Sequence, residues 1–339
     1  MKFSPLPDVH RHAVPAAPPG ADALCPTVFH EVWWLDAAAP GAWAEVTERA
    51  GDRIVGRLPY LLRPARLGGA SCEMPDFCHF LGPAIDAGSG AACNRTLRRD
   101  RILRALIARL PPHGAFSQRM HRGLSDVLVF AEAGFHSHAQ FTFEIAPDHP
   151  DRLWSAMRDK TRNVIRRAQE RHVLSETLSP EDFARFYVRQ AAATGTACYY
   201  PEAGMARVTA AALDRGRGRI LAALGPDGQI AAAIFCVWDA TCCYYLLSMR
   251  QRGADKGATA LLLWEAIRHA AARGLVFDFD GLLTRGNRVF FVGFGGTVRP
   301  RYHVTRRTTA NRLVRLASSL PARLSQRLTA APVGDSAED

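Results

Sequence analysis

No run of apolar residues in this sequence is long enough to cross a bilayer as a helix. The apolar segment at residues 230–238 is short, whereas a membrane-spanning helix needs about 20 residues. Residues 1–20 are rich in Pro, His and Ala and lack the apolar core of a secretory signal. We therefore expect a soluble, cytoplasmic protein and leave open a peripheral position at the inner face of the membrane.

The cysteines lack the Cys-x-x-Cys spacing that is typical of zinc ribbons and thioredoxin-type redox sites. They are scattered, and several lie within apolar segments, which favours buried thiols in a reducing compartment. The histidines show no zinc-site spacing either. We predict that the protein binds no metal, and that Cys198 is a small core thiol rather than the site of a covalent acyl-enzyme.

Acidic residues are too few to balance the basic ones, and the formal net charge is +11. Such an excess favours anionic partners: nucleic acid, phosphorylated metabolites or an acidic membrane surface. A GC-rich coding bias is the alternative as a partial cause. Because no helix-turn-helix or zinc-finger pattern is present, DNA binding ranks last among these roles.

The basic excess is densest near the C-terminal end. Between Arg299 and Arg327 there are eight arginines and no acidic residue, and leucines recur there at helical spacing. We predict a basic amphipathic tail over residues 309–328, followed by a disordered end. Such a helix can lie on an anionic bilayer, pack on the body of the protein, or bind tRNA phosphates.

The length of 339 residues suits two domains of ordinary size. Residues 1–26 are proline-rich and predict a disordered lead, and residues 146–150 form the best linker. We therefore place one domain at 27–148 and a second at 149–308, followed by the tail at 309–339. Both halves mix helices with short strands, so we predict an α/β (α+β) fold with mixed, mostly antiparallel sheets flanked by helices.

Periodicity and turn residues predict the elements of each half. In the first half we expect a helix at 28–35, one bent strand or two strands at 53–62, a loop-rich segment at 68–90 that lines a surface or a cleft, a helix at 98–110 and a closing strand at 141–145. In the second we expect helices at 151–172 and 180–193, a loop at 194–201, and strands at 219–224, 229–238 and 241–249. The helix at 151–172 carries Arg158, Arg162 and Arg166 at every fourth position. This basic stripe either binds phosphates or is a solvent-exposed helix face.

Residues 241–296 organise the second half. A strand leads into a charged, glycine-bearing turn at 250–257 and then into an apolar helix. Amides near the start of such a helix, together with its dipole, can bind a pyrophosphate. The cofactor-binding residues that we predict on this basis are Arg252, Lys256, Gly257 and Ala258. The alternative is a solvated strand-to-helix turn.

Candidate catalytic residues follow on the two strands of this stretch. Asp278 and Asp280 alternate with phenylalanines, so both carboxylates share one face of a strand. One of them can take a proton from an attacking ammonium, an effect worth about 10²–10⁴-fold in rate; alternatively it binds loop amides. Tyr245 can protonate a leaving group, although buried tyrosines are common in sheets.

Four segments of the second half resemble a known family in their order and spacing. They read DKTRNVIRRA at 159–168, LLLWEAI at 261–267, FDFDG at 277–281 and FG at 294–295. They resemble the Fem-type branch of the GNAT acyltransferase superfamily, which includes peptidoglycan peptidyltransferases and acetyltransferase-like proteins of cellulose and exopolysaccharide loci. The first half is similar to the N-terminal part of that family at Trp34-Leu35, Leu58-Pro59 and Leu81-Gly82-Pro83. The resemblance covers residues 27–305.

This resemblance implies tandem GNAT-like domains with the cleft mainly on the second. It implies an acyl-CoA co-substrate or an aminoacyl-tRNA donor, and an amine acceptor. Asp278 matches a family position, and Fem peptidyltransferases carry a lysine where this chain has Phe291. The acceptor-binding residues that we predict are Arg162, Arg166, Tyr199, Tyr200 and Phe294.

We expect an N-acyltransferase that uses an acyl-CoA-type thioester, with acetyl-CoA as the first candidate. Amides of residues 245–248 would hold the carbonyl oxygen, and the acceptor would be a small or glycan- or peptide-linked amine of cell-envelope or exopolysaccharide metabolism. One alternative is an aminoacyl-tRNA-dependent peptidyltransferase. The other is a non-catalytic GNAT scaffold that binds an anionic membrane through the tail.

Overall fold

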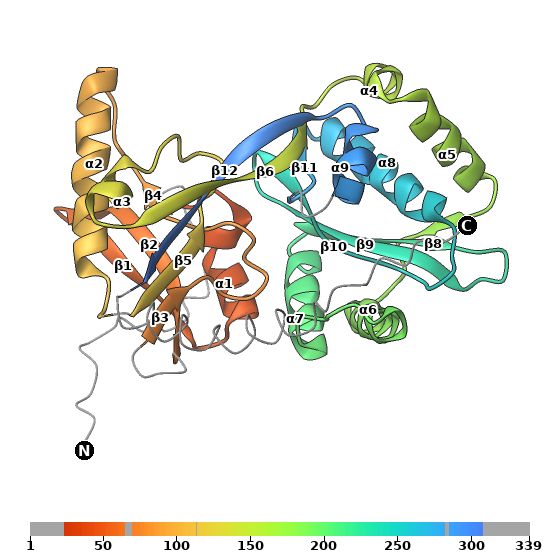
Figure 1. Ribbon diagram of the computed structural model, residues 1–339, viewed down its shortest axis with the longest axis horizontal. Coiled ribbons are helices and arrows are strands. Elements are labelled where there is room, and N and C mark those ends of the chain that lie inside the picture. The colour runs from red at the N-terminus through yellow and green to blue at the C-terminus, as the bar shows by residue number, and fades with distance from the viewer. Residues whose placement is uncertain (1–23, 65–69, 113, 282–284, 308–339) are drawn as a thin grey trace, which may run out of the picture.

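A computed structural model describes residues 24–64, 70–112, 114–281 and 285–307 (Figure 1). Most of the predicted lead and the whole of the predicted basic tail at 309–328 lie outside these described residues. Within them, one continuous sheet of mixed direction runs through both halves in the order β1-β2-β3-β5-β12-β6-β11-β10-β9-β8-β7, with β4 beside β2. Apart from the parallel pairs β3–β5 and β10–β11, the paired strands are antiparallel.

The N-terminal half contains half of the described strands and a few helices that cover them. Its strands are β1 (Trp43–Ala50), β2 (Arg53–Pro64), β3 (Ala70–Glu73), β4 (Ala84–Ile85), β5 (Ala115–Arg119) and β6 (His136–Ile145). Its helices are η1 (Val28–His30), α1 (Val32–Ala38), α2 (Ala92–Arg109) and α3 (Leu128–Glu132). Gly56 lets β2 pass under α2, because a side chain there would meet Ile102.

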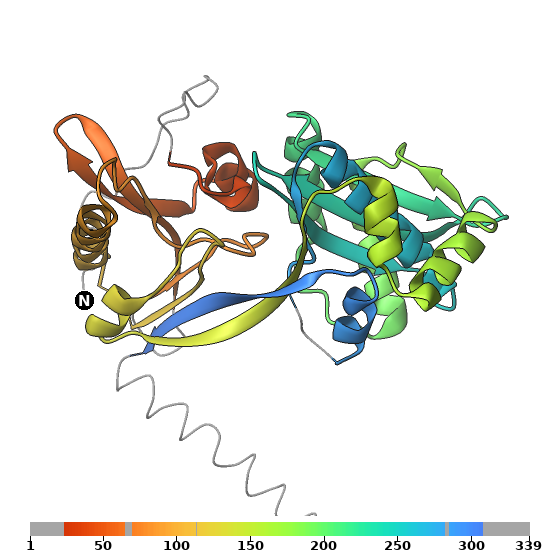
Figure 2. The same ribbon diagram turned by 90° about the horizontal axis from the view of Figure 1, so that it is seen from above.

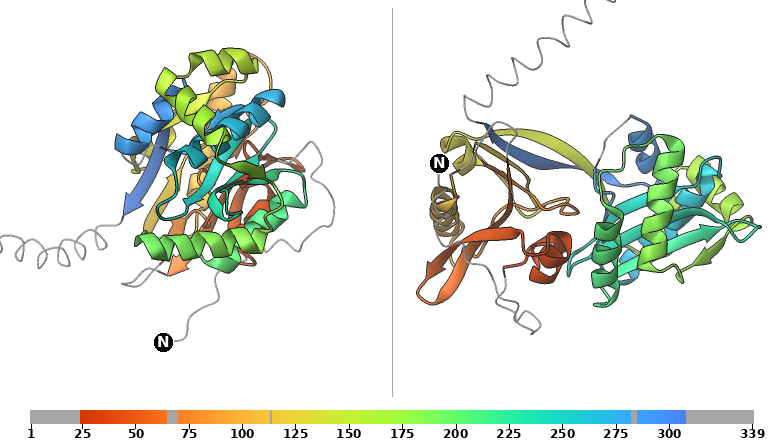
Figure 3. Two further views of the ribbon diagram at one scale, coloured as in Figure 1. Left: turned by 90° about the vertical axis from the view of Figure 1, so that its right-hand side faces the viewer. Right: turned by 90° about the horizontal axis from the view of Figure 1, so that it is seen from below.

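The C-terminal half places its sheet between two layers of helices (Figure 3). The strands are β7 (Val173–Ser175), β8 (Gly218–Leu224), β9 (Ile230–Trp238), β10 (Cys242–Arg250) and β11 (Val276–Asp278). The helices are α4 (Pro150–Ala156), α5 (Asp159–Gln169), α6 (Pro180–Thr194), α7 (Glu202–Leu213), α8 (Lys256–Ala272) and α9 (Arg285–Val292). Helices α5 and α8 cover one face, and α6 and α7 cover the other. The predicted α/β (α+β) class, with a mostly antiparallel sheet flanked by helices, is confirmed.

Two long strands join the halves. β12 (Thr297–Arg307) follows the C-terminal half in sequence, yet it pairs along its length with β6 and also with β5. β6 in turn pairs through Ile145 and Glu144 with β11. Figure 2 shows β6 and β12 running side by side from one half to the other. The strand expected at 141–145 is therefore present but starts at His136, and it continues the sheet into the C-terminal half.

The single helix expected over residues 151–172 is wrong. The chain is extended at Met157 and Arg158, with ψ angles of 151° and 142°, and these residues separate α4 from α5. Met157 is buried in the core, and the Arg158 amide donates to the Gly293 carbonyl at 3.0 Å. These tertiary contacts override the local helical periodicity, so Arg158 does not share a helix face with Arg162 and Arg166.

Asp239, which follows β9, binds the first turn of the chain to the C-terminal half. One carboxylate oxygen accepts from the amides of Thr241 and Cys242 at 2.8 and 2.9 Å. The other accepts from the Val28 amide at 3.3 Å and from the Tyr244 hydroxyl at 2.9 Å. Because Asp239 is buried, these hydrogen bonds replace its hydration.

We expect Asp239→Asn to lower the free energy of unfolding by about 2–3 kcal/mol. The amide nitrogen of asparagine cannot accept, so donors that bind a charged group are left buried without a partner. Urea unfolding measures the change, with Asp227→Asn in the exposed turn after β8 as the matched control. Equal effects at the two positions would contradict this account of Asp239.

Candidate active site

The parallel strands β10 and β11 separate at the centre of the C-terminal sheet. They pair only over Cys242–Tyr244 and Val276–Asp278, while β10 continues to Arg250 with an irregularity between Tyr245 and Leu247. Within the described residues, no strand pairs with β10 on the β11 side beyond Tyr244. Backbone groups of residues 245–250 therefore line an open edge at the carboxyl end of a parallel pair, where ligands of α/β sheets bind.

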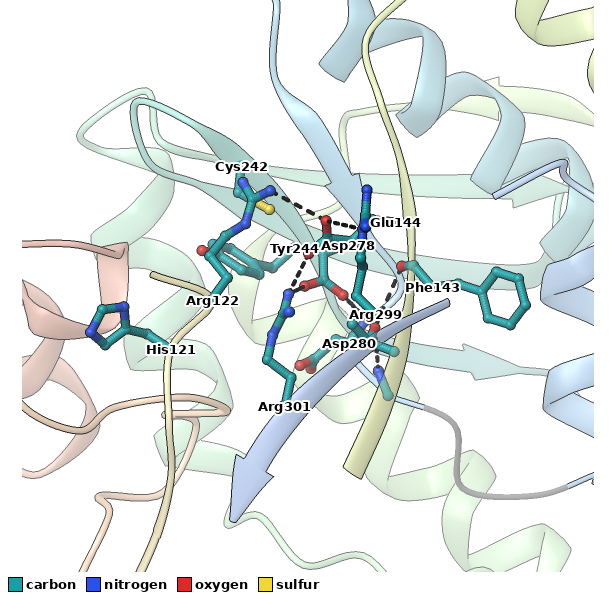
Figure 4. Close-up of polar contacts among 12 residues, drawn as sticks. His121, Arg122, Phe143, Glu144, Cys242, Tyr244, Asp278, Asp280, Arg299 and Arg301 are labelled. Carbon is teal, nitrogen blue, oxygen red and sulfur yellow. Dashed lines mark hydrogen bonds and ion pairs between the residues drawn. The ribbon is translucent and has the colours of Figure 1, made fainter. Parts of the chain in front are cut away.

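Asp278 lies at this point of separation, on the face of β11 opposite the apolar cluster that contains Phe277. Its carboxylate is fully buried. One oxygen accepts from the Thr142 hydroxyl at 2.5 Å and from the Asp280 amide at 2.8 Å, and the other accepts from Arg301 at 2.9 Å (Figure 4). Asp278 thus has neither exposed surface nor a free oxygen for a substrate.

Asp278 belongs to a network of charges that joins β6, β11 and β12. Arg301 also donates to Glu144. Arg122 donates to the same carboxylate at 3.2 Å, and Arg299 forms an ion pair with it at 3.8 Å. Burial raises the pKa of Asp278 to about 6, although the Arg301 charge and the Thr142 hydrogen bond oppose the shift. The network is a buried joint between the two halves of the protein.

Asp280 continues the chain from this joint toward the N-terminal half. Its carboxylate is almost completely buried and contacts Nδ1 of His79 through Oδ2, while Oδ1 has no hydrogen-bond partner. The other ring nitrogen of His79, Nε2, lies 3.2 Å from the Tyr200 hydroxyl. Asp280 from the end of β11, His79 from the β3–β4 loop and Tyr200 from the α6–α7 loop therefore form one line of polar contacts.

The protonation of this line follows from its chemistry. Burial, with the nearby Arg119 charge, lowers the pKa of His79 to about 3, so its ring is neutral at pH 7. An ionised carboxylate only accepts, so His79 donates from Nδ1 to Asp280 and accepts at Nε2 from Tyr200. Burial raises the pKa of Tyr200, which keeps its hydroxyl protonated as the donor.

Backbone strain marks the same place. Among the described residues, Asp280 at φ 59° and Phe77 at φ 64° are the non-glycine residues with positive φ. Phe77 lies two positions before His79, and its ring stacks on Tyr200 with centroids 4.4 Å apart. Strained non-glycine residues cluster at functional sites, where the surrounding structure holds them in place.

A cavity of about 160 Å³ lies beside Tyr200. Its lining comes from the β3–β4 loop, from β5 and from the α6–α7 loop. The lining residues are Glu73, Met74, Pro75, Asp76, Phe77, Cys78, Ser117, Arg119 and Tyr200. The loop expected at 68–90 thus borders a cavity between the halves, as its composition indicated.

The residues predicted to bind a pyrophosphate lie around the start of α8. Arg252 and Lys256 are exposed, but the Arg252 guanidinium donates to the Ala193 carbonyl at 3.2 Å. The Gly257 amide already donates to the carboxylate of the N-cap residue Asp255 at 2.9 Å. Gly257 and Ala258 are buried, and a side chain at Gly257 would press on Ala168 of α5. Helix packing therefore explains why residue 257 is a glycine. Of the four predicted residues, the exposed cations Arg252 and Lys256 are the ones that can contact a phosphate.

The residues predicted to bind the acceptor are dispersed. Arg162 donates to the carbonyls of Trp154 and Ser155, and Arg166 lies 5.4 Å over the Trp154 ring. Tyr199 is 83% exposed, whereas Phe294 is buried in the core. Of this set, the structure brings Tyr200 alone into the line with Asp280. His79 was not among the residues predicted from the sequence. Its position between apolar residues of the loop is the feature of the sequence that could have indicated it.

Tyr245 and Phe291 lie together on the side of the sheet that α8 covers. Burial raises the pKa of Tyr245, while its hydrogen bond to Ser248 acts the other way. The ring of Phe291 packs edge-on against Tyr245 at 6.4 Å and lies 4.5 Å from Phe279. The position at which Fem peptidyltransferases carry a lysine is therefore part of an aromatic core in this chain.

Comparison with known proteins supports the fold. Residues 155–290 match the family of the acetyltransferase (GNAT) domain. FemX has a similar structure over 80% of this chain and 90% of its own, with a TM-score of 0.60 at 12% identity. The C-terminal domain of a candidate lysylphosphatidylglycerol synthetase from Agrobacterium fabrum covers 85% of this chain and 91% of its own, with a TM-score of 0.53 at 13% identity.

A protein of unknown function from Bacteroides thetaiotaomicron is also similar, with a TM-score of 0.52 at 11% identity over 83% of this chain and 90% of its own. Among curated proteins, none matches this chain in sequence. The predicted resemblance to the Fem-type branch of the GNAT superfamily is confirmed at the level of the fold. Within the described ranges, no helix combines the length and the apolar character that a membrane span requires.

We predict that Asp278→Asn changes the pH dependence of stability. The pKa of Asp278 rises from 3.8 to about 6 on folding, so the stability that its protonated form contributes is complete below pH 3.8 and is lost as the pH rises through about 6. Asparagine mimics the protonated carboxyl at every pH. Relative to the unsubstituted protein, the variant should therefore gain on the order of 1–3 kcal/mol in free energy of unfolding between pH 4 and pH 7.

Urea unfolding across this pH range makes the measurement, and the exposed substitution Asp227→Asn is the control. A free-energy difference that does not change with pH would show that the buried carboxyl does not titrate in this range.

Proposed function

We propose that this protein is an N-acyltransferase that transfers an acyl group from an acyl-CoA-type thioester, with acetyl-CoA as the first candidate, to an amine. The observation that carries the proposal is the open edge of β10, which lies inside the segment that matches the GNAT domain. Amides along this edge would donate to the thioester carbonyl oxygen as it becomes an oxyanion, the interaction that contributes most to acyl transfer.

The phosphates of the donor would lie near the start of α8. The Gly257 amide is occupied by Asp255, so Arg252 and Lys256 would supply the attraction as charges. The raised pKa of Tyr245 keeps its hydroxyl protonated on β10, the strand that would hold the acyl group. Tyr245 is therefore the group that we assign to protonation of the leaving thiolate.

The acceptor would lose its proton to the line of Tyr200, His79 and Asp280. The ammonium proton passes to the Tyr200 oxygen as the hydroxyl proton moves to Nε2 of His79. Burial disfavours the imidazolium that forms, and the Asp280 carboxylate in contact with Nδ1 offsets that cost. The amine nitrogen then bonds to the carbonyl carbon, and the carbon–sulfur bond breaks. The second amine proton, lost as the amide forms, goes to the Tyr245 oxygen and replaces the proton that Tyr245 has given to the thiolate. The fully bonded Asp278 holds this line in place and does not accept the proton.

A donor of a different kind is the second candidate, because a net charge of +11 suits a charged tRNA. The burial of Phe291 in the aromatic core leaves that position without the lysine of the Fem peptidyltransferases. We therefore rank an aminoacyl-tRNA-dependent reaction second and a non-catalytic membrane-bound scaffold third. For each of these three candidate functions we propose a role in cell-envelope or exopolysaccharide metabolism.

Donor binding separates these candidates. We expect acetyl-CoA to bind the purified protein at 200 mM salt, and Arg252→Ala/Lys256→Ala to raise its Kd about tenfold, since each lost contact to a charged group is worth about 1.5 kcal/mol or less in water. Isothermal titration calorimetry gives the constants, and Arg101→Ala on the exposed side of α2 is the control. Binding of charged but not uncharged tRNA, with no thioester binding, would instead support the second candidate.

The proton path has its own test. We expect Asp280→Asn, His79→Gln and Tyr200→Phe each to lower kcat by about 10²–10⁴-fold, the usual contribution of general base catalysis, while the Kd for the thioester stays unchanged. Steady-state acyl transfer to a panel of amines provides kcat. Tyr302→Phe, which removes a hydroxyl that donates to the Ser125 carbonyl at 3.3 Å, is the matched control. A Tyr200→Phe variant with full activity would remove Tyr200 from the path.

A further inference from the structure

The cavity beside Tyr200 is lined by an arginine that has no ion-pair partner among the described residues. We propose that this cavity binds the anionic end of the acyl acceptor, so that the acceptor is a small amine carrying a carboxylate or a phosphate, with Arg119 as its counter-charge. This inference rests on the proposed acyl transfer, because it names the substrate class of the same site.

Arg119 lies at the end of β5, half-buried in the cavity wall. Within the described part of the chain, its guanidinium makes no hydrogen bond or ion pair, and its backbone amide contacts the Met74 sulfur. Other buried arginines are paired: Arg57 donates to Glu45 at 2.6 Å and Arg301 to Asp278 at 2.9 Å. Arg119 is partly shielded from water, and an anionic ligand would supply the ion pair that the described residues do not.

The carboxylates that line the cavity are not partners of Arg119. Asp76 pairs with Arg63 at 2.7 Å and Glu73 pairs with the same arginine at 3.4 Å. Burial lowers the pKa of Arg119, and the nearby Tyr200 acts in the opposite direction. The positive charge of Arg119 also helps to lower the pKa of His79 and of His303, which both lie near it. Of the charged residues that line the cavity, Arg119 is therefore the one without an ion pair among the described residues.

The size and the position of the cavity restrict what this charge binds. A volume of about 160 Å³ suits a group of about six non-hydrogen atoms, since an engineered cavity of about 150 Å³ holds benzene. Tyr200 lines the same cavity while its hydroxyl contacts His79. An anion on Arg119 would therefore orient an amine in the same small molecule toward the Tyr200 hydroxyl. A neutral amine would leave Arg119 unpaired.

Calorimetric titration of the protein without donor tests the proposal. The probes are β-alanine for the carboxylate class, phosphoethanolamine for the phosphate class, and ethanolamine as the amine without an anion. We expect at least one of the first two to bind and ethanolamine not to bind. Arg119→Gln should raise the Kd at least tenfold and Arg119→Lys less, while the exposed Arg101→Gln has no effect.

Thermal unfolding of the same variants excludes a purely structural role. Because the Arg119 guanidinium has no hydrogen-bond or ion-pair partner among the described residues, Arg119→Gln should melt no lower than the unsubstituted protein. Equal affinity of both anionic probes for Arg119→Gln, or no binding of either probe to a protein that still binds acetyl-CoA, would overturn the inference. If acetyl-CoA does not bind but an Arg119-dependent anion does, the anion site stands and the proposed acyl transfer fails.

Discussion

The ion pair network of Arg301 with Asp278 and Glu144 is the constraint on which the candidate site depends. It lies where β6, β11 and β12 meet, so it ties the strand that carries Asp278 to both strands that cross between the halves. Burying these charges is favourable only if each is paired and hydrogen-bonded. The need to pair these charges therefore specifies how the two halves join, because any slip of β12 along β6 would separate Arg301 from its carboxylates.

This joint also determines the conformation of the residue that follows it. Asp278 accepts from the Asp280 amide, and Thr142 accepts from the Gly281 amide at 3.0 Å. These bonds hold the chain where Asp280 takes its unfavourable φ, so the joint compensates for the local strain. The Asp280 carboxylate then meets His79, a residue of the opposite half. A buried structural network thus positions the polar line, and neither half contains that line alone.

The sequence predicted the parts of this arrangement that depend on local patterns. Alternation with the aspartates correctly placed Phe277 and Phe279 in the apolar core, and most of the strands and helices expected in the C-terminal half are present. β11 ends at Asp278, however, and Asp280 follows it with a positive φ, so strand alternation does not describe the Asp280 side chain. The break at Met157 escaped prediction because it follows from burial and from a contact with Gly293, far along the chain. His79 escaped for the same reason, since its partners are 121 residues away at Tyr200 and still more distant at Asp280.

The cations predicted from the sequence differ from Arg119 in whether they already have partners. Arg162 donates to backbone carbonyls of α4, and Arg166 donates to the side-chain oxygen of Asn163 and lies over the Trp154 ring of α4. Asp255 caps the amide that a phosphate would need. Arg119 carries the same charge but lies where no side chain of the described residues neutralises it. The sequence gives the number of cations, whereas the structure shows which of them already have a hydrogen-bond or ion-pair partner. The unpaired cation beside Tyr200 is for that reason a stronger indication of a ligand than the whole net charge.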